Sequence, residues 1–300
     1  MTAMEQSVEQ AAELSADRTG ADPVHSQREP LGPDSLTWRR FGDLRIALLM
    51  LWSGTLQGMH PVISAALIEH SDFFDNAVNR LLRSGGPIVD VVYHGAAAGR
   101  AVRGHHDRIE GRDEHGRYYH ALHADPYYWA HATFVQSQYV VAEFCGERLS
   151  EDDKERLYQE SIRWYGQYGL SMRPVPPDYR AFRVYWDRML TEVLTRTPAI
   201  ERSPLLSGDP GPSPFPEVPE PVWQLVGPPL VRGLNWVARG LMPEPARRAL
   251  GWSWSPAEQR SLRVVGEVIR TGFRLLPPSY RLAPRARAAY VRAAAEGRAS

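Results

Sequence analysis

Residues 125–146 have the sequence DPYYWAHATFVQSQYVVAEFCG, which predicts one long helix that is buried on most sides. Asp125 can cap this helix, Pro126 suits its first position, and Gly146 suits its end. Between these ends, residues 127–145 are apolar around most of the helical circumference. That pattern is typical of a core helix, so we expect other elements to cover it.

Helical periodicity also dominates the segments on both sides of this stretch. Helices are expected at residues 36–56, 61–70, 72–82, 99–110, 150–169, 179–194, 222–242, 243–250 and 256–276. The segment Ser84-Gly85-Gly86-Pro87 is expected to break the chain before a short strand at residues 88–93. A turn at residues 113–116 between two short extended pieces predicts a small β-hairpin. The predicted fold class is all-α with this hairpin.

Prolines are dense between Pro174 and Pro229. Because proline disfavours helix interiors and central strands, residues 198–221 are expected to form an extended crossover on the surface. The expected organisation is a flexible N-terminal tail at residues 1–31, one helical domain at residues 32–282, and a C-terminal tail at residues 283–300.

Composition excludes several functional classes. The 300 residues carry 35 basic and 35 acidic side chains, so no global charge draws the chain to nucleic acid. Cys145 is the only cysteine, which excludes intrachain disulfides, cysteine-rich zinc sites and CxxC redox chemistry. Lys154 is the only lysine and lies in a charged helix start, which disfavours pyridoxal phosphate enzymes and P-loop NTPases. The GxGxxG, GxSxG, HExxH and protein-kinase signatures are absent.

The N-terminal segment lacks an apolar region behind a basic start, so we expect no signal peptide and a cytoplasmic protein. The longest apolar stretch, residues 44–56, is too short to cross a bilayer. Residues 222–242 place Leu230, Leu234 and Val237 on one helical face beside tryptophans. Such a face can lie on a membrane, but docking on the core is the favoured interpretation.

All ten histidines lie at or before His131, which indicates that the first half of the chain houses the chemistry. His131 lies in the middle of the predicted core helix, with aromatic residues one turn away. Burial there favours the neutral imidazole, which is the form that ligates metal. The alternative is a core histidine that bonds to a backbone carbonyl. His60, which precedes Pro61, could merely satisfy a backbone group.

A second candidate feature lies on the helix expected at residues 99–110. Arg100, Arg103, His106 and Glu110 have helical spacing there, and Arg103 is a neighbour of His106. An arginine beside a histidine could serve an anion, a propionate or bound dioxygen. The alternative is a stripe of ion pairs on the surface.

Several short strings, taken together and in this order, resemble a known family. They are Met59-His60-Pro61, Glu69-His70-Ser71, Arg103-Gly104-His105-His106, residues 109–126 (IEGRDEHGRYYHALHADP), Trp129-Ala130-His131-Ala132-Thr133, Tyr168-Gly169-Leu170-Ser171-Met172 and Leu276-Pro277-Pro278. Over about residues 32–282 the chain resembles bacterial members of the rubber-oxygenase catalytic-domain family. That family includes the latex-clearing proteins and the MpaB-type oxygenase.

The resemblance implies a globin-reminiscent helical domain that binds haem b and acts with dioxygen on an apolar substrate, such as an isoprenoid, a lipid or a polyketide-like chain. His131 matches the axial ligand of the haem iron. Arg103 and His106 match the helix on the other side of the haem and are the candidate catalytic residues. Arg100 and Arg173 are expected to bind the haem. Latex-clearing proteins also place a lysine near the distal side, and no lysine of this chain matches it.

Two other functions stay open. One is a haem-binding or lipid-binding protein that senses its ligand without turnover. The other is a non-haem metal oxygenase that uses a cluster of His106, His120, His123 and His131. The sequence carries no signal for the oligomeric state.

Overall fold

The computed structural model describes residues 29–113 and 115–299, so most of the predicted N-terminal tail lies outside the described residues. Within that tail, Leu31 already packs in the hydrophobic core. The α-helices are α3 (Leu36–Phe41), α4 (Met50–Gly58), α5 (Pro61–His70), α6 (Ala77–His94), α7 (Ala96–Gly104), α8 (Ala124–Phe144), α9 (Glu151–Gly166), α10 (Tyr179–Arg188), α11 (Pro198–Glu201), α12 (Pro204–Ser207), α13 (Glu220–Leu241), α14 (Glu244–Ala249), α15 (Pro256–Leu275) and α16 (Pro284–Ala299). Short 3-10 or π segments are η2 (Leu44–Leu49), η3 (Asp72–Phe74), η4 (Met189–Val193) and η5 (Pro278–Tyr280).

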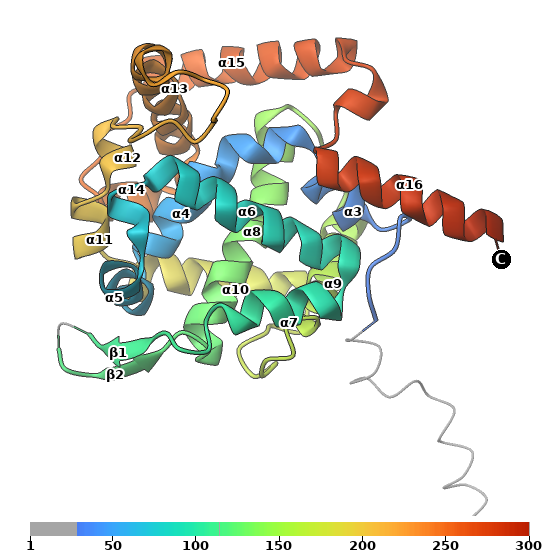
Figure 1. Ribbon diagram of the computed structural model, residues 1–300, viewed down its shortest axis with the longest axis horizontal. Helices are drawn as coiled ribbons and strands as arrows, with labels where there is room; N and C mark the ends of the chain where they lie inside the picture. Colours follow the sequence, from blue (N-terminus) through green and yellow to red (C-terminus); the bar gives the residue numbers. More distant parts are fainter. Residues whose placement is uncertain (1–28, 114, 300) are drawn as a thin grey trace, which may run out of the picture.

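In the described part of the chain, the one sheet is a hairpin of β1 (Glu110–Arg112) and β2 (Tyr118–His120). Its strands are antiparallel, with Gly111 opposite Tyr119. The hairpin projects from one end of the helical body (Figure 1). The prediction of an all-α domain with a small β-hairpin is thereby confirmed.

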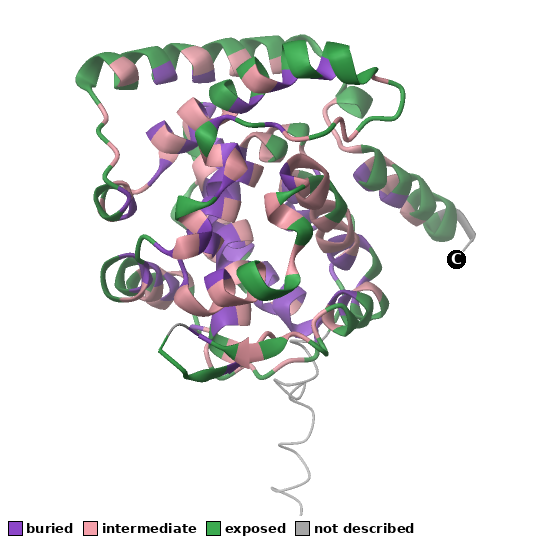
Figure 2. Ribbon diagram, turned by 60° about the vertical axis from the view of Figure 1, so that its left-hand side comes forward, coloured by how far each residue is buried: buried purple, intermediate pink, exposed green. Residues whose placement is uncertain are grey.

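Helix α8 passes through the middle of the molecule (Figure 1), and Figure 2 shows the buried residues concentrated in this interior. Two hydrogen bonds join α8 to α4. Trp129 Nε1 donates to the Leu56 carbonyl oxygen at 3.0 Å, and Gln57 Nε2 donates to Thr133 Oγ1 at 2.7 Å. The predicted central helix is confirmed, since most of its residues are buried, but it begins at Ala124 behind His123, so the predicted cap by Asp125 is wrong.

Helix α6 continues through residues 84–87 and 88–93, so the predicted chain break and short strand are wrong. Tertiary packing overrides the weak helix propensity of the Gly-Gly-Pro segment. Helix α16 docks on α6 here, and Arg285 of α16 pairs with Asp90. Gly86 allows this close approach, because a Cβ atom at that position would lie 3.0 Å from the Arg285 guanidinium.

The segment predicted as a C-terminal tail is therefore mostly helix α16. Its Ala286 and Ala289 are buried in the core, where small side chains let the helix approach closely. In the proline-rich crossover, α11 and α12 each place a proline at the first helical position behind a side-chain cap from Thr197 or Ser203. Proline is tolerated there because the missing N–H would have no partner in the helix. The expected extended crossover is thus partly helical.

No single helix among the described residues is long and apolar enough to cross a membrane. Residues 44–58 and α5 pass that test only as a pair, and the two are bent by 102°. Helix α13 packs on the core through Trp223, Val231 and Val237, which agrees with the favoured interpretation. Leu230, which was expected on the same face, is 52% exposed instead.

A buried carboxylate holds α3 against α9. Glu160 is 6% exposed, and its oxygens accept hydrogen bonds from the Leu36 and Thr37 backbone N–H groups at 3.1 and 2.7 Å. These groups lie in the first turn of α3, where a helix has N–H donors without intrahelical partners. Arg156 Nε also donates to Glu160 at 3.0 Å.

Replacement of Glu160 by alanine should therefore lower the free energy of unfolding by about 2–4 kcal/mol, because two buried N–H groups lose their acceptor. Urea unfolding followed by circular dichroism measures this loss. Glu160→Gln keeps one acceptor oxygen and should lose less, and Glu192→Ala at an exposed position serves as the control. Equal stability of Glu160→Ala and the control would contradict the assigned role.

Candidate functional site

His131 is enclosed by aromatic side chains from three helices. We call this set the aromatic cluster, and it comprises Tyr127, Tyr128, Trp164, Tyr165, Tyr168 and Tyr185. The imidazole centroid lies 4.6 Å from the ring of Trp164 and 5.2 Å from that of Tyr165, both on α9. His131 is only 2% exposed, so its ring is shielded from solvent.

The hydrogen bonds of His131 define its tautomer. Nε2 lies 3.1 Å from the Ser161 carbonyl oxygen, which can only accept, so Nε2 carries the proton. Nδ1 then holds a lone pair, and this atom is buried without a hydrogen-bond partner. Burial lowers the pKa of His131 to about 3, despite the opposing effect of the Ser161 hydrogen bond. The histidine is therefore neutral, as the sequence analysis predicted.

The contact with Ser161 agrees with the interpretation of His131 as a core histidine, but it satisfies only one ring nitrogen. Buried polar atoms normally have a partner, and among the described residues Nδ1 is one of ten buried side-chain nitrogen and oxygen atoms without one. It supplies the lone pair that a metal ligand requires. The Tyr165 hydroxyl, on a neighbouring ring, is also buried without a partner.

The tyrosines of the aromatic cluster stay protonated. Burial is the largest cause of the raised pKa of Tyr127, Tyr128, Tyr165, Tyr168 and Tyr185. Because the imidazole is neutral as well, the side chains around His131 carry no charge at neutral pH. Such surroundings suit an apolar ligand and disfavour a charged one.

The structure places His106 beside the same aromatic cluster. Helix α7 ends at Gly104, earlier than the predicted end at residue 110, and His106 lies in the following turn. The His106 ring lies 5.6 Å from Tyr127, which is 5.3 Å from Tyr168, which in turn is 6.0 Å from His131. Tyr127 and Tyr168 thus connect the two histidines.

His106 is also neutral, with the opposite tautomer. Its Nδ1 donates to the Val102 carbonyl oxygen at 2.9 Å, which leaves Nε2 as an acceptor. Burial lowers its pKa, and the positive charges of Arg80 and His105 act in the same direction. Arg103 is half-buried, and its Nη1 donates to the Gly169 carbonyl oxygen at 3.4 Å.

Two predicted haem-binding arginines lie on the surface. Arg173 is 67% exposed and forms an ion pair with Asp125 near the start of α8. Arg100 is exposed on α7. The aromatic rings that contact His131 come from α8 and α9, so the structure does not bring either arginine into contact with that histidine.

The predicted non-haem cluster is not assembled. His120 and His123 lie near each other at the end of the hairpin, with ring centroids 6.1 Å apart. Across residues 29–113 and 115–299, no three His, Cys, Asp or Glu side chains gather in a way that could hold a metal ion.

Sequence reasoning missed the contribution of α9. Ser161, Trp164 and Tyr165 share the face of α9 that meets α8, and Tyr168 follows in the turn after the end of the helix at Gly166. This spacing is visible in the sequence, although it does not reveal which helix the face contacts. His60 was assigned correctly, because its Nδ1 accepts from the Val62 N–H at the start of α5.

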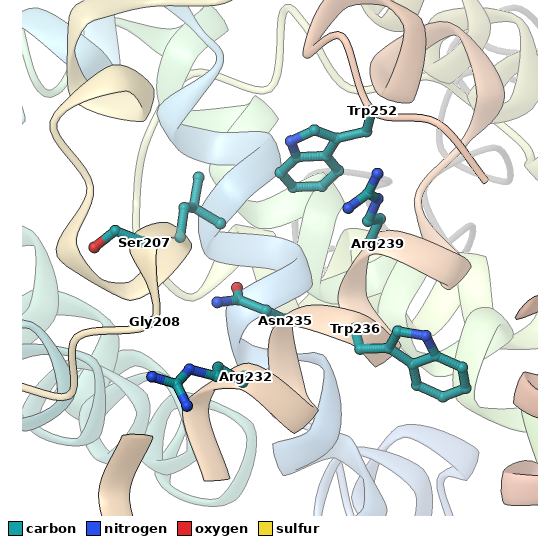
Figure 3. A pocket seen from close by; sticks show the side chains of 8 residues that line it. Ser207, Gly208, Arg232, Asn235, Trp236, Arg239 and Trp252 are labelled. Atoms are coloured by element: carbon teal, nitrogen blue, oxygen red, sulfur yellow. The ribbon is translucent and has the colours of Figure 1, made fainter. Parts of the chain in front are cut away.

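Two pockets lie outside the aromatic cluster. The smaller, of about 230 Å³, is lined by Leu206, Ser207, Gly208, Arg232, Asn235, Trp236, Arg239 and Trp252. Figure 3 shows Ser207 and Gly208 across this pocket from Arg239 and Trp252. The larger, of about 710 Å³, lies between α3, α15 and α16. The described residues that line these two pockets do not include His131, Arg103 or His106.

The chemistry of His131 fits a side chain that would bind haem iron. A neutral imidazole with an unpartnered lone pair is the required donor, and Nδ1 provides it. The ring is enclosed, so the side chains around Nδ1 would have to move aside to admit a porphyrin. The fit of haem iron to His131 therefore rests on the free lone pair of Nδ1 and not on a preformed cavity.

A pH titration of stability should report the neutral state of His131. Below its ordinary pKa of 6.5, the unfolded chain takes up a proton that the folded protein takes up only near pH 3. The contribution of the neutral His131 to stability is therefore complete above pH 6.5 and falls as the pH decreases, by about 1.4 kcal/mol per pH unit for each such proton. His131→Gln should show a slope that is shallower by this amount in urea unfolding between about pH 6 and 4.

His60, whose pKa burial lowers to about 4, contributes to the slope in both proteins and cancels from the comparison. The exposed neighbour His105→Gln should keep the wild-type slope. An identical slope in His131→Gln and wild type would contradict the buried neutral imidazole.

Comparison with known proteins gave one match. The family model described as "ER-bound oxygenase mpaB/B'/Rubber oxygenase, catalytic domain" matches residues 38–271. No curated protein and no solved structure matches the chain. The matched range covers α3 to α15 with the aromatic cluster, and it agrees with the resemblance seen in the short sequence strings.

Proposed function

The chain belongs to the mpaB/rubber oxygenase catalytic-domain family, and from that premise we propose that it is a haem-b-dependent oxygenase that acts on an apolar small molecule. Membership makes the chain an oxidoreductase domain of the oxygenase type. The proposal itself consists of three points: the dependence on haem b, His131 as the axial ligand, and an apolar substrate.

One observation carries the proposal: His131 is buried and neutral, and its Nδ1 has no partner. His131 is the residue that would hold the iron. Haem iron, when bound, supplies the activation of dioxygen that the protein side chains cannot perform. The aromatic cluster excludes water from this position, since its side chains shield His131 from solvent.

Arg103 and His106 supply the polar groups at the edge of the aromatic cluster. Arg103 carries permanent N–H donors, and His106 Nε2 can accept a proton while Nδ1–H stays bound to the Val102 carbonyl. We assign proton transfer to His106 Nε2 and anion stabilisation to Arg103. Arg100 and Arg173 are assigned to the haem propionates, and Arg173 would exchange Asp125 for a propionate.

The uncharged surroundings of His131 support an apolar substrate. Neutral tyrosines and tryptophan offer ring faces and edges, and an ionised group placed among them would lose its hydration without an opposite charge in return. An isoprenoid, lipid or polyketide-like chain meets this requirement.

The ultraviolet–visible spectrum of protein purified from haem-supplemented cells tests the proposal. We expect a Soret band that corresponds to about one haem per chain, and loss of this band in His131→Leu. Arg103→Gln and His106→Gln should keep the band and lose about 100-fold or more in substrate-dependent oxygen consumption, the usual scale for an anion-stabilising donor and for a proton-transfer group. His105→Gln is the matched control and should retain both.

Three results would overturn parts of the proposal. Wild-type protein that takes up no haemin would remove haem dependence and leave family membership intact. A full Soret band in folded His131→Leu would remove the axial assignment, and an iron–histidine stretch in the resonance Raman spectrum of wild type tests the same point without a variant. Haem binding without oxygen consumption on any apolar substrate would favour a sensing role.

A further inference from the structure

The larger pocket lies toward the opposite end of α8 from His131. Its lining includes Val141, which follows His131 by ten residues and is therefore displaced by about 15 Å along the helix axis. We call it the arginine pocket, and it is lined by Leu36, Arg39, Arg40, Asp43, Arg45, Val141, Glu147, Asp153, Arg270, Phe273, Arg274, Pro278, Arg281, Leu282 and Tyr290. It is a second site, separate from the aromatic cluster.

The arginine pocket concentrates positive charge in a protein whose net charge is zero. Six of its lining residues are arginines and three are acidic, so the lining carries an excess of three positive charges. Low-dielectric walls around such a pocket concentrate the field and attract anions.

Two of the acidic residues are already paired. Arg45 binds Asp43 at 2.6 Å and Glu147 at 2.7 Å, and Arg40 binds Glu147 at 3.1 Å. Burial alone would lower the pKa of Arg45, but hydrogen bonds and charges from Asp43 and Glu147 outweigh it and raise the pKa. These four side chains form a fixed ion-pair network in the wall of the pocket.

The remaining arginines are less fully paired. Arg39 and Arg274 are exposed at the pocket, and within the described chain their guanidinium groups have no hydrogen-bond or ion-pair partner. Arg270 pairs with Glu267 through its Nη2, and its buried Nε has no acceptor. Arg281 donates to the carbonyl oxygens of Leu276 and Arg274, which holds the end of α15 in place.

Apart from the carboxylate of Asp153, the rest of the lining is apolar or aromatic. Leu36, Val141, Phe273, Leu282 and Tyr290 supply it, and the Arg45 guanidinium lies 4.6 Å from the centroid of the Phe273 ring. The volume of about 710 Å³ exceeds what an inorganic anion fills and falls in the usual range of pockets for small organic ligands. Free guanidinium groups beside apolar walls fit a ligand with a charged end and an apolar chain.

We propose that the arginine pocket binds an anionic amphiphile, in which a carboxylate or phosphate group is joined to an apolar chain. Arg39 and Arg274 bind the anionic group, for which the planar guanidinium offers paired N–H donors. The leucine and aromatic side chains of the pocket contact the apolar chain.

Isothermal titration calorimetry with laurate and with dodecyl phosphate, each kept below its aggregation concentration, tests the proposal. We expect wild type to bind at least one of the two probes with one site per chain. The variant Arg39→Gln/Arg274→Gln should bind at least tenfold more weakly, because the anionic group loses its free partners. The probe with the higher affinity identifies the carboxylate or the phosphate as the preferred group.

The control variant Arg260→Gln/Arg263→Gln removes the same charge from exposed positions of α15 outside the pocket, and it should bind like wild type. Both variants should unfold at the wild-type temperature, since none of the four arginines forms an ion pair in the described part of the chain. Dodecanol binding as tight as laurate binding would overturn the proposal, as would inorganic phosphate binding as tight as dodecyl phosphate binding. The proposal would also be overturned if neither laurate nor dodecyl phosphate bound to wild type, or if Arg39→Gln/Arg274→Gln bound them as tightly as wild type does.

Discussion

Helix α8 has little contact with solvent, so most of its polar side chains must find partners inside the protein. Trp129 bonds to a carbonyl of α4, Thr133 to Gln57 of the same helix, and His131 to the Ser161 carbonyl of α9. These bonds fix α4 and α9 against α8. Helix α9 in turn holds the start of α3 through Glu160. The contacts of the buried helix α8 with α9 therefore also position α3.

The same burial sets the chemistry of the candidate site. Removal from water lowers the pKa of His131 and raises the pKa values of the tyrosines around it, so all of them are neutral at physiological pH. Among these neutral groups, Nδ1 of His131 is an unpartnered nitrogen with a free lone pair. A neutral cluster with one free nitrogen lone pair is compatible with a metal-centred cofactor and an apolar substrate, which is the chemistry proposed for this oxygenase-family domain.

Charge is distributed unevenly even though the whole chain is neutral. The aromatic cluster around one part of α8 carries no charge, while the arginine pocket toward its other end carries an excess of positive charge. Helix α8 connects the two regions but supplies different surfaces to each, His131 to the first and Val141 to the second. Net charge is a sum over the chain and therefore says nothing about such local fields, which depend on where each arginine is placed.

The sequence by itself determined the all-α class, the central helix and the neutral state of His131, because the apolar content of residues 127–145 acts locally. It mispredicted residues 84–93 as a break and a strand, since docking of α16, far away in the chain, keeps α6 helical there. Only the tertiary structure brought Tyr165 and Tyr168 to His131, and Arg39 to the pocket of Arg274. These residues lie far apart in sequence, and the packing of whole helices decides which side chains meet.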